Sequence, residues 1–139
     1  MNYNIVGKYI KNLNFQIPNP QIYSSLSKEI VDYKINIDIK SNQIKEKIIE
    51  VETSLKLISD KENAGKLNTE IVLSAIIEIS SQSIDKKELE KIILVKVPSS
   101  IYPEIRKIFL FLFENSGFKE IKINKTVDFE NLYKKRKNQ

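Results

Sequence analysis

Four stretches of the chain alternate apolar and polar residues with a period of two, which is the pattern of half-buried β-strands. In each stretch the odd-numbered positions are apolar. The four sets are Tyr9, Leu13, Phe15 and Ile17; Val31, Tyr33, Ile35, Ile37 and Ile39; Ile49, Val51, Leu55 and Leu57; and Leu67, Ile71, Leu73, Ala75, Ile77 and Ile79. This alternation predicts a four-stranded antiparallel sheet with one solvated face and one covered face.

Proline and polar residues mark the connections between these strands. Pro18 and Pro20 predict the end of the first strand, because proline has no N–H to donate to a neighbouring strand. We expect an irregular crossover over residues 19–29, with Ile22, Tyr23 and Leu26 as its apolar side chains. Turns are predicted at residues 41–42 and at 60–65, where polar residues separate the second, third and fourth strands.

The apolar spacing becomes helical after the fourth strand. Asp85 followed by Glu88 is the pattern of a capping box, which predicts a short helix. A longer helix is expected to begin at residues 99–100 and to end at Gly117, since glycine is the preferred residue just beyond a helix. After a short extended connection, Asp128 is predicted to cap a last helix. We expect the basic end of that helix, residues 133–139, to fray.

The second half of the long helix is apolar on all sides, and such a helix must be covered on all sides. One four-stranded sheet can cover only one side of it. The rest is therefore predicted to meet another subunit, which makes the protein an oligomer, most simply a tetramer. The residues assigned to this interface are Ile105, Phe109, Phe111, Leu112 and Phe113.

The composition narrows the possible functions. A length of 139 residues fits a single domain, residues 1–139, that needs no disulfide or metal to stabilise its core. Cysteine and histidine are both absent, so the commonest nucleophile, general base and metal ligands are missing. We expect neither catalysis nor a cofactor nor a metal site. The first residues lack the features of a signal peptide, and no apolar run is long enough to span a membrane, which predicts a cytoplasmic protein.

A formal net charge of +5 raises a different class of function, a small lysine-rich nucleic-acid-binding module. Of the 23 basic residues, however, only Arg106 and Arg136 are arginine. Arginine is the residue that binds phosphate with two parallel hydrogen bonds and stacks on bases. A lysine excess scattered among acidic residues mostly indicates a solvated surface, so nucleic-acid binding is the weaker hypothesis.

Two segments at opposite ends of the chain resemble the SecB family of protein-export chaperones. The first, residues 9–23, is similar to the family's opening strand: aromatic-x-Lys-x-apolar-x-Phe-x-x-Pro-Asn-x-x-x-aromatic. The second set, residues 98–106 and 126–133, is similar to its main helix, apolar-aromatic-Pro-x-x-Arg, and to its closing Val-Asp-Phe-x-x-Leu-aromatic element. The resemblance implies an α+β fold in which a long helix covers one face of the sheet and a shorter helix follows.

This resemblance also implies a function. SecB proteins are ATP-independent holdases that bind unfolded preproteins and keep them competent for Sec-dependent export, and they form dimers of dimers. Their client groove lies between the crossover and the terminal helix, which assigns client binding here to Ile22, Tyr23, Leu26, Tyr102, Phe129, Leu132 and Tyr133. Divergent SecB-like proteins also serve as chaperones of toxin-antitoxin systems, which is the alternative role within the same class.

The chain departs from the family where the SecA translocation motor docks. SecB proteins carry acidic residues on the outward face of the sheet, and the matching positions here are Asn12, Gln16 and Glu70. Two carboxylates are thus replaced by amides, and the acidic C-terminus of the family is basic in this chain. We therefore expect SecA docking to be weak, while the fold and client binding are retained.

Overall fold

The computed structural model describes residues 2–29, 34–58, 68–80, 83–118, 121 and 123–137. Its strands are β1 (Tyr3–Gln16), β2 (Lys34–Lys45), β3 (Ile48–Ile58) and β4 (Asn68–Ile79), which form one antiparallel sheet in the order β1-β4-β3-β2. The helices are α1 (Pro20–Glu29), α2 (Lys86–Lys91), η3 (Ile92–Lys96), α3 (Val97–Glu114) and α4 (Phe129–Lys137). This arrangement confirms the predicted α+β fold. The predicted strand residues Val31, Tyr33 and Leu67 and the predicted turn at 60–65 lie outside the described residues.

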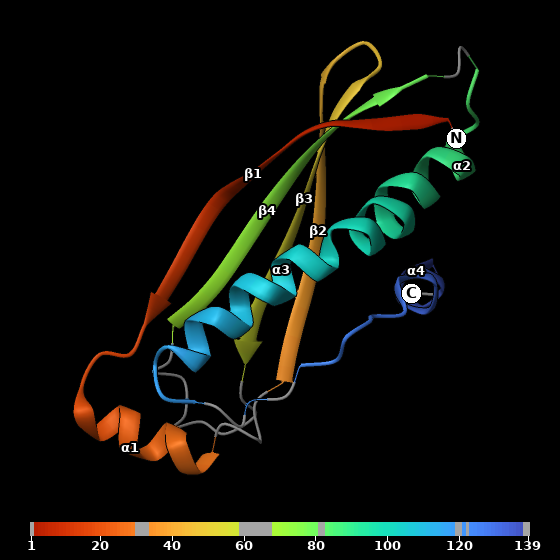
Figure 1. Ribbon diagram of the computed structural model, residues 1–139. Coiled ribbons are helices and arrows are strands. Elements are labelled where there is room, and N and C mark those ends of the chain that lie inside the picture. Colours follow the sequence, from red (N-terminus) through yellow and green to blue (C-terminus); the bar gives the residue numbers. More distant parts are fainter. Residues whose placement is uncertain are drawn as a thin grey trace.

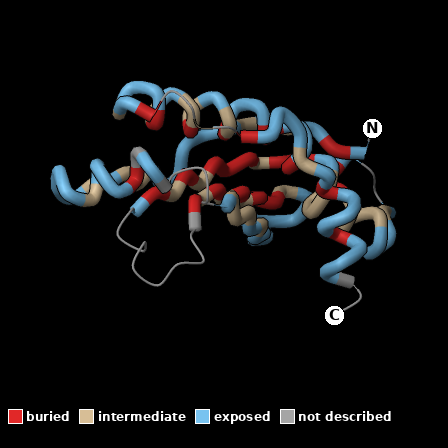
Figure 2. Tube along the Cα trace, turned by 90° about the horizontal axis from the view of Figure 1, so that it is seen from below, coloured by how far each residue is buried: buried red, intermediate tan, exposed pale blue. Residues whose placement is uncertain are grey.

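The core lies between one face of the sheet and α3, which runs obliquely across that face (Figure 1). Odd-numbered residues of β3 and β4 point into this core, as the period-two pattern predicts. Figure 2 shows the buried positions gathered between the sheet and the helices. From the strands they include Ile49, Val51, Leu55, Leu57, Ile71, Leu73, Ala75, Ile77 and Ile79, and from α3 Ile101, Ile105, Phe109 and Phe113.

β1 departs from the predicted alternation. It begins at Tyr3, well before the predicted strand, and its pairing with β4 shifts register between Ile5 and Gly7 and again between Ile10 and Asn12. Each shift is a bulge that reverses which face the following residues occupy. Tyr9 therefore pairs with Ser74 on the outward face and is exposed, where alternation alone predicts that it is buried.

The two helices predicted after the sheet are one continuous helical rod. The predicted cap is confirmed, since the Asp85 carboxylate accepts a hydrogen bond from the Glu88 N–H at 2.7 Å. The rod then passes through the π-helical segment η3, in which the Val97 N–H reaches back to the Ile92 carbonyl. Pro98 follows directly at the start of α3, and because proline has no N–H it donates no backbone hydrogen bond to the preceding turn.

α3 ends at Glu114, and Gly117 is the glycine predicted just beyond it, with a φ of 92° that glycine adopts without strain. The Phe118 N–H donates to the Phe113 carbonyl at 2.9 Å and the Gly117 N–H to the Glu114 carbonyl at 3.3 Å. These two bonds form a Schellman motif, and the Phe113 and Phe118 rings lie 5.9 Å apart in its accompanying apolar contact.

Two local predictions are wrong. The crossover, predicted to be irregular, forms α1, because Asn19 caps it by accepting the Ile22 N–H at 2.9 Å and Pro20 suits a first helical position. The turn predicted at 41–42 is absent, since β2 continues to Lys45 and the chain turns at Lys47, which has a positive φ. α4 is described as far as Lys137, and the fraying expected over residues 133–139 stays a prediction.

Candidate functional site: an apolar groove and an outward sheet face

A groove of about 600 Å³ lies between β2 and the C-terminal part of the chain, and we call it the α4 groove. Its lining is mostly apolar or uncharged: Ile35, Asn36, Ile37, Tyr102, Asn124, Thr126, Val127, Asp128, Asn131 and Leu132. Asp128 is its only charged member, and that carboxylate caps α4 by accepting the Asn131 N–H at 2.9 Å. The interior of the groove therefore offers apolar surface and amide groups.

Hydrogen bonds from α3 hold the wall of the α4 groove in place. The Tyr102 hydroxyl donates to the Asn124 carbonyl at 2.7 Å, and Arg106 Nε donates to the Ile123 carbonyl at 3.1 Å. Burial raises the pKa of the Tyr102 hydroxyl, so it stays a hydrogen-bond donor at neutral pH. The Tyr102 and Phe129 rings pack edge to face with centroids 6.1 Å apart, which attaches α4 to α3.

One edge of β2 borders this groove. β2 is the last strand in the sheet order, so its outer edge has no strand beside it in the described part of the chain. Ile35, Asn36 and Ile37 all line the groove although neighbouring strand residues point to opposite faces, which places the groove along the strand's backbone edge. A second hollow of about 470 Å³ continues along β2 at Ile39 and Ser41, with Ile93 and Arg136 opposite.

The residues predicted to bind clients divide into two groups. Tyr102, Phe129, Leu132 and Tyr133 come together around α4, as predicted. Of these only Leu132 is broadly exposed, at 42%, and it lines the α4 groove. Tyr133 is buried, and its hydroxyl donates to Glu90 at 3.0 Å. Tyr102 and Phe129 form the support beneath the groove.

The other group, Ile22, Tyr23 and Leu26, lies on α1 near the opposite end of α3 (Figure 1). Leu26 is buried, whereas Tyr23 is 41% exposed and packs on Phe118 with ring centroids 5.2 Å apart. The single groove predicted between crossover and terminal helix is therefore not formed within one chain. The reason is that the crossover folds into a helix that docks on the end of α3.

Sequence reasoning missed the contribution of β2 to the groove. Ile35 and Ile37 appear in the sequence only as members of a period-two strand, and nothing there places that strand at the edge of the sheet. Asn124 and Thr126 lie in a segment without a periodic pattern. The strand order places β2 at the edge of the sheet, and the strand order is known only from the structure.

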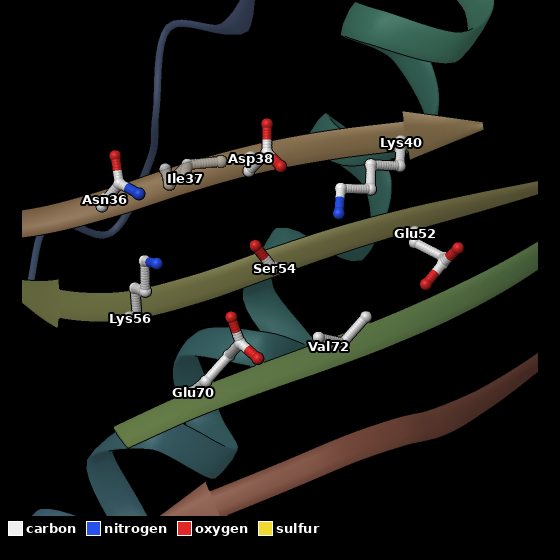
Figure 3. Close-up of a pocket in the computed structure, with 9 residues that line it drawn as sticks. All are labelled: Asn36, Ile37, Asp38, Lys40, Glu52, Ser54, Lys56, Glu70 and Val72. Carbon is white, nitrogen blue, oxygen red and sulfur yellow. The ribbon is translucent and has the colours of Figure 1, made fainter. Parts of the chain in front are cut away.

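The outward face of the sheet carries a shallow hollow of about 290 Å³, which we call the outer hollow (Figure 3). Its residues come from β2, β3 and β4: Asn36, Ile37, Asp38, Lys40, Glu52, Ser54, Lys56, Glu70 and Val72. The small side chain of Ser54 lies at the middle strand with charged side chains around it. Of the three residues predicted for SecA docking, Glu70 belongs to this hollow.

The other two docking residues lie beside it on β1. Asn12 Nδ2 donates to the Glu70 carboxylate at 3.2 Å, so the two residues do come together as predicted, and Gln16 is exposed. The amide at position 12 thus holds Glu70 by a hydrogen bond, where a carboxylate would repel it. This part of the face carries one carboxylate.

Next to the outer hollow, Glu50 is the centre of a polar cluster that sequence reasoning missed. Its carboxylate accepts hydrogen bonds from Ser74 Oγ at 2.7 Å, from Lys11 Nζ at 3.1 Å and from the Tyr9 hydroxyl. The hydrogen bonds from Tyr9, Ser74 and Lys11 lower the pKa of Glu50 to about 2, despite its burial. The cluster joins β1, β4 and β3 across the outward face.

The residues predicted for the oligomer interface lie on different sides of α3. Ile105, Phe109 and Phe113 are buried against the chain's own sheet. Leu112 is half-buried, and Phe111 is 62% exposed. Among the five, Phe111 is therefore the residue that the described part of the chain leaves most exposed.

Other kinds of site are absent from the described ranges. No group of three or more acidic residues in these ranges is arranged to hold a metal ion. No helix in the same ranges is long and apolar enough to cross a membrane.

Comparison with known proteins agrees with this geometry. Residues 1–139 match the family model described as preprotein translocase subunit SecB. The chain is 42% identical over 137 residues to a putative protein-export protein SecB of Pelagibacter ubique, covering 99% of this chain and 98% of that protein. It is 25% identical over 136 residues to the protein-export protein SecB of Rhodospirillum rubrum, covering 95% and 80%.

Among solved structures, the chain is similar to the SecB-like chaperone of Mycobacterium tuberculosis, which was solved in complex with a ChAD peptide from the HigA1 antitoxin. The TM-score is 0.64 at 12% identity, over 88% of this chain and 90% of that one. At this identity the likeness concerns the fold alone. It agrees with the sheet and helices described above.

These comparisons confirm the resemblance predicted from the two end segments, and with it the expectation that the chain is not an enzyme, because the family consists of chaperones. The chain belongs to the SecB family of protein-export chaperones.

Proposed function

We propose that this protein is an ATP-independent holdase that binds unfolded preproteins in extended form along β2 and keeps them competent for Sec-dependent export. The observation that carries the proposal is the α4 groove, whose lining combines apolar side chains with uncharged polar ones and which is bordered by a strand edge. An unfolded chain offers apolar side chains and free backbone groups. The groove wall binds the apolar side chains, and the outer edge of β2 binds the free backbone groups by pairing with the client as an added strand.

The test is suppression of aggregation of an unfolded model protein, measured by light scattering. Leu132→Glu places a charge in the α4 groove and is expected to weaken client capture by about tenfold, because apolar segments no longer desolvate there. Ile44→Glu is the matched control, since Ile44 is 51% exposed near the end of β2 and lies outside the groove. Equal capture by both variants and the wild type would contradict this binding site.

Export is favoured over the antitoxin-chaperone role by the protein names of the relatives that match nearly the whole chain. The likeness to the antitoxin-binding chaperone supports the fold only. A nucleic-acid module finds no support in these relatives. Handing clients to the SecA motor would then use the outward sheet face around Asn12, Gln16 and Glu70.

We expect that docking to be weak in the wild type. Asn12→Asp with Gln16→Glu should strengthen SecA binding, chiefly at low salt, because exposed carboxylates attract a basic partner and salt screens that attraction. Titration of the wild type and the double variant against the motor of the same organism measures this. Tight wild-type binding that the added carboxylates do not improve would show that another surface is used.

A further inference from the structure

The second hollow beside β2, of about 470 Å³, carries positive charge, unlike the α4 groove, and we call it the η3 hollow. It follows the α4 groove along the strand, since β2 contributes residues 35–37 to the groove and residues 39–41 to the hollow. Its other lining residues include Ile93 and Leu94 of η3, and Arg136 near the end of α4. An extended chain that pairs with the outer edge of β2 therefore passes along both hollows.

Arg136 is an unpaired cation in the η3 hollow. It is exposed, and it makes no hydrogen bond or ion pair within the described part of the chain. Glu90, the carboxylate of this lining, instead accepts a hydrogen bond from the Tyr133 hydroxyl at 3.0 Å. Lys40 also lines the hollow, but its ammonium is directed over the outer hollow (Figure 3). Arg136 is thus the cation that this hollow offers to a partner.

A carboxylate is the group that suits Arg136 best. A guanidinium group binds a carboxylate through two parallel hydrogen bonds. Apolar side chains of Ile39, Ile93 and Leu94 line the same hollow, and they shield such a pair from water, which strengthens it relative to a fully exposed pair. The α4 groove has the opposite preference, because its charged member is Asp128, which repels a carboxylate. The two hollows therefore differ in the client side chains that they accept.

We propose that the η3 hollow is a second client subsite, in which Arg136 binds an acidic side chain of the same extended segment whose apolar side chains fill the α4 groove. Side chains on one face of a strand recur at every second residue, and Ile35 and Ile39 of β2 share a face. The preferred client segment therefore has an acidic residue about four positions from an apolar one. This inference rests on the proposed function and adds to it a sequence preference of the client.

The test uses two fluorescent peptides in which x is serine. The first has the pattern Glu-x-x-x-Leu-x-Leu-x-x-x-Glu, so that a glutamate reaches the η3 hollow in either direction of pairing with β2. The second has glutamine at both of these ends. Fluorescence anisotropy at low salt measures both affinities. The wild-type protein is expected to bind the glutamate peptide at least about fivefold more tightly, because only a carboxylate forms a charged pair with the guanidinium group.

Arg136→Gln should remove this preference, so that both peptides bind as the glutamine peptide binds to the wild type. Lys135→Gln is the matched control, because Lys135 is an exposed residue of α4 outside both hollows and its replacement changes the net charge equally. This control should keep the preference. Equal binding of the two peptides by the wild type would overturn the inference. An equal loss of preference in both variants would overturn it too, because net charge alone would then attract the peptide.

Leu132→Glu separates this inference from the proposed function. It changes the α4 groove, so it should weaken the binding of both peptides. Peptide binding that Leu132→Glu leaves unchanged would count against the proposed function. Binding that this variant weakens, but that is the same for glutamate and glutamine in the wild type, would overturn the acidic subsite alone and leave the α4 groove as the client site.

Discussion

At the scale of single residues, Glu50 is the most constrained charge in the described part of the chain. It is 6% exposed, yet it is ionised, because Tyr9, Ser74 and Lys11 donate hydrogen bonds to its carboxylate. A buried carboxylate is stable only when its oxygens are satisfied in this way. The cluster also contacts Tyr9, which lies on the outward face between the two bulges of β1.

The depressed pKa makes this contribution depend on pH. A carboxyl whose pKa is about 2 in the folded state and 4.5 when unfolded stabilises the fold above 4.5, and the stabilisation is lost as the pH falls toward 2. Glu50→Gln is expected to lower the free energy of unfolding by about 1–3 kcal/mol at neutral pH. The difference from the wild type should shrink in acid.

Urea unfolding at neutral pH and at about pH 3 measures this difference. Glu78→Gln is the control. Glu78 is an exposed glutamate of β4 on the outward face of the sheet, and its loss should change the free energy of unfolding little at either pH. A wild-type advantage over Glu50→Gln that stays constant into acid would show that the cluster acts through packing rather than through ionisation.

Gly117 is a second residue whose role is specific. Its φ of 92° disfavours any other residue, and an added Cβ would lie 2.5 Å from the Tyr23 hydroxyl oxygen. Gly117→Ala is expected to destabilise the fold by about 2–3 kcal/mol, partly from backbone strain and partly from that clash. In the background of Tyr23→Phe the cost should fall, because the clashing oxygen is gone. Thermal unfolding of the four proteins in this double-mutant cycle gives the coupling free energy between the two positions. A coupling free energy of zero would mean that Tyr23 does not lie against Gly117, and that α1 is placed differently.

At the scale of elements, the sequence predicts what depends on local periodicity and capping. The sequence predicts the strands β2 to β4, apart from the extension of β2 to Lys45, together with the caps at Asp85 and Asp128 and the glycine that follows α3. The bulges of β1 were not predicted, because a bulge is defined against the partner strand, and a period-two pattern in one strand does not contain it. The helix α1 was missed although its Asn19-Pro20 start was readable.

In the candidate site, too, the features that depend on local sequence pattern were predicted and those that depend on the overall fold were not. Tyr102, Phe129 and Leu132 were predicted to lie together and do so, because each belongs to a helix whose apolar face can be recognised from the sequence. The contribution of β2 depends on strand order, and the separation of α1 from α4 depends on how the crossover docks. Neither is encoded in a local pattern.

The location of α1 leads to a prediction about that element. Leu26 is 2% exposed and belongs to the core, whereas Tyr23 lies at the surface. Leu26→Ala should therefore lower the free energy of unfolding by about 2–4 kcal/mol, while Tyr23→Ser should cost about 1 kcal/mol or less. Chemical denaturation of the two variants measures both values. Equal costs would mean that α1 is held by its surface contacts and not by Leu26.

At the scale of the whole molecule, two apolar strips are exposed among the described residues. One is the outer side of α3 at Phe111. The other follows β1, the edge strand at the opposite side of the sheet from β2, where Val6, Ile10 and Leu13 are 58%, 48% and 44% exposed. Long apolar edge strands aggregate unless they are paired or covered. We propose that both strips are covered by further copies of this chain.

A dimer of dimers requires two interfaces, and we expect each of these surfaces to form one of them. Phe111→Glu should break the contact through α3 and leave a dimer joined at β1, because an unpaired charge buried in an interface costs several kcal/mol. Ile10→Lys should leave the dimer joined at α3, and the double variant should be a folded monomer. Analytical ultracentrifugation gives the mass of each species, with Leu132→Glu as a control that removes an exposed apolar residue outside both strips. Circular dichroism confirms that each variant is folded. A wild-type protein that sediments as a stable monomer, or a Phe111→Glu variant that remains tetrameric, would rule out this arrangement.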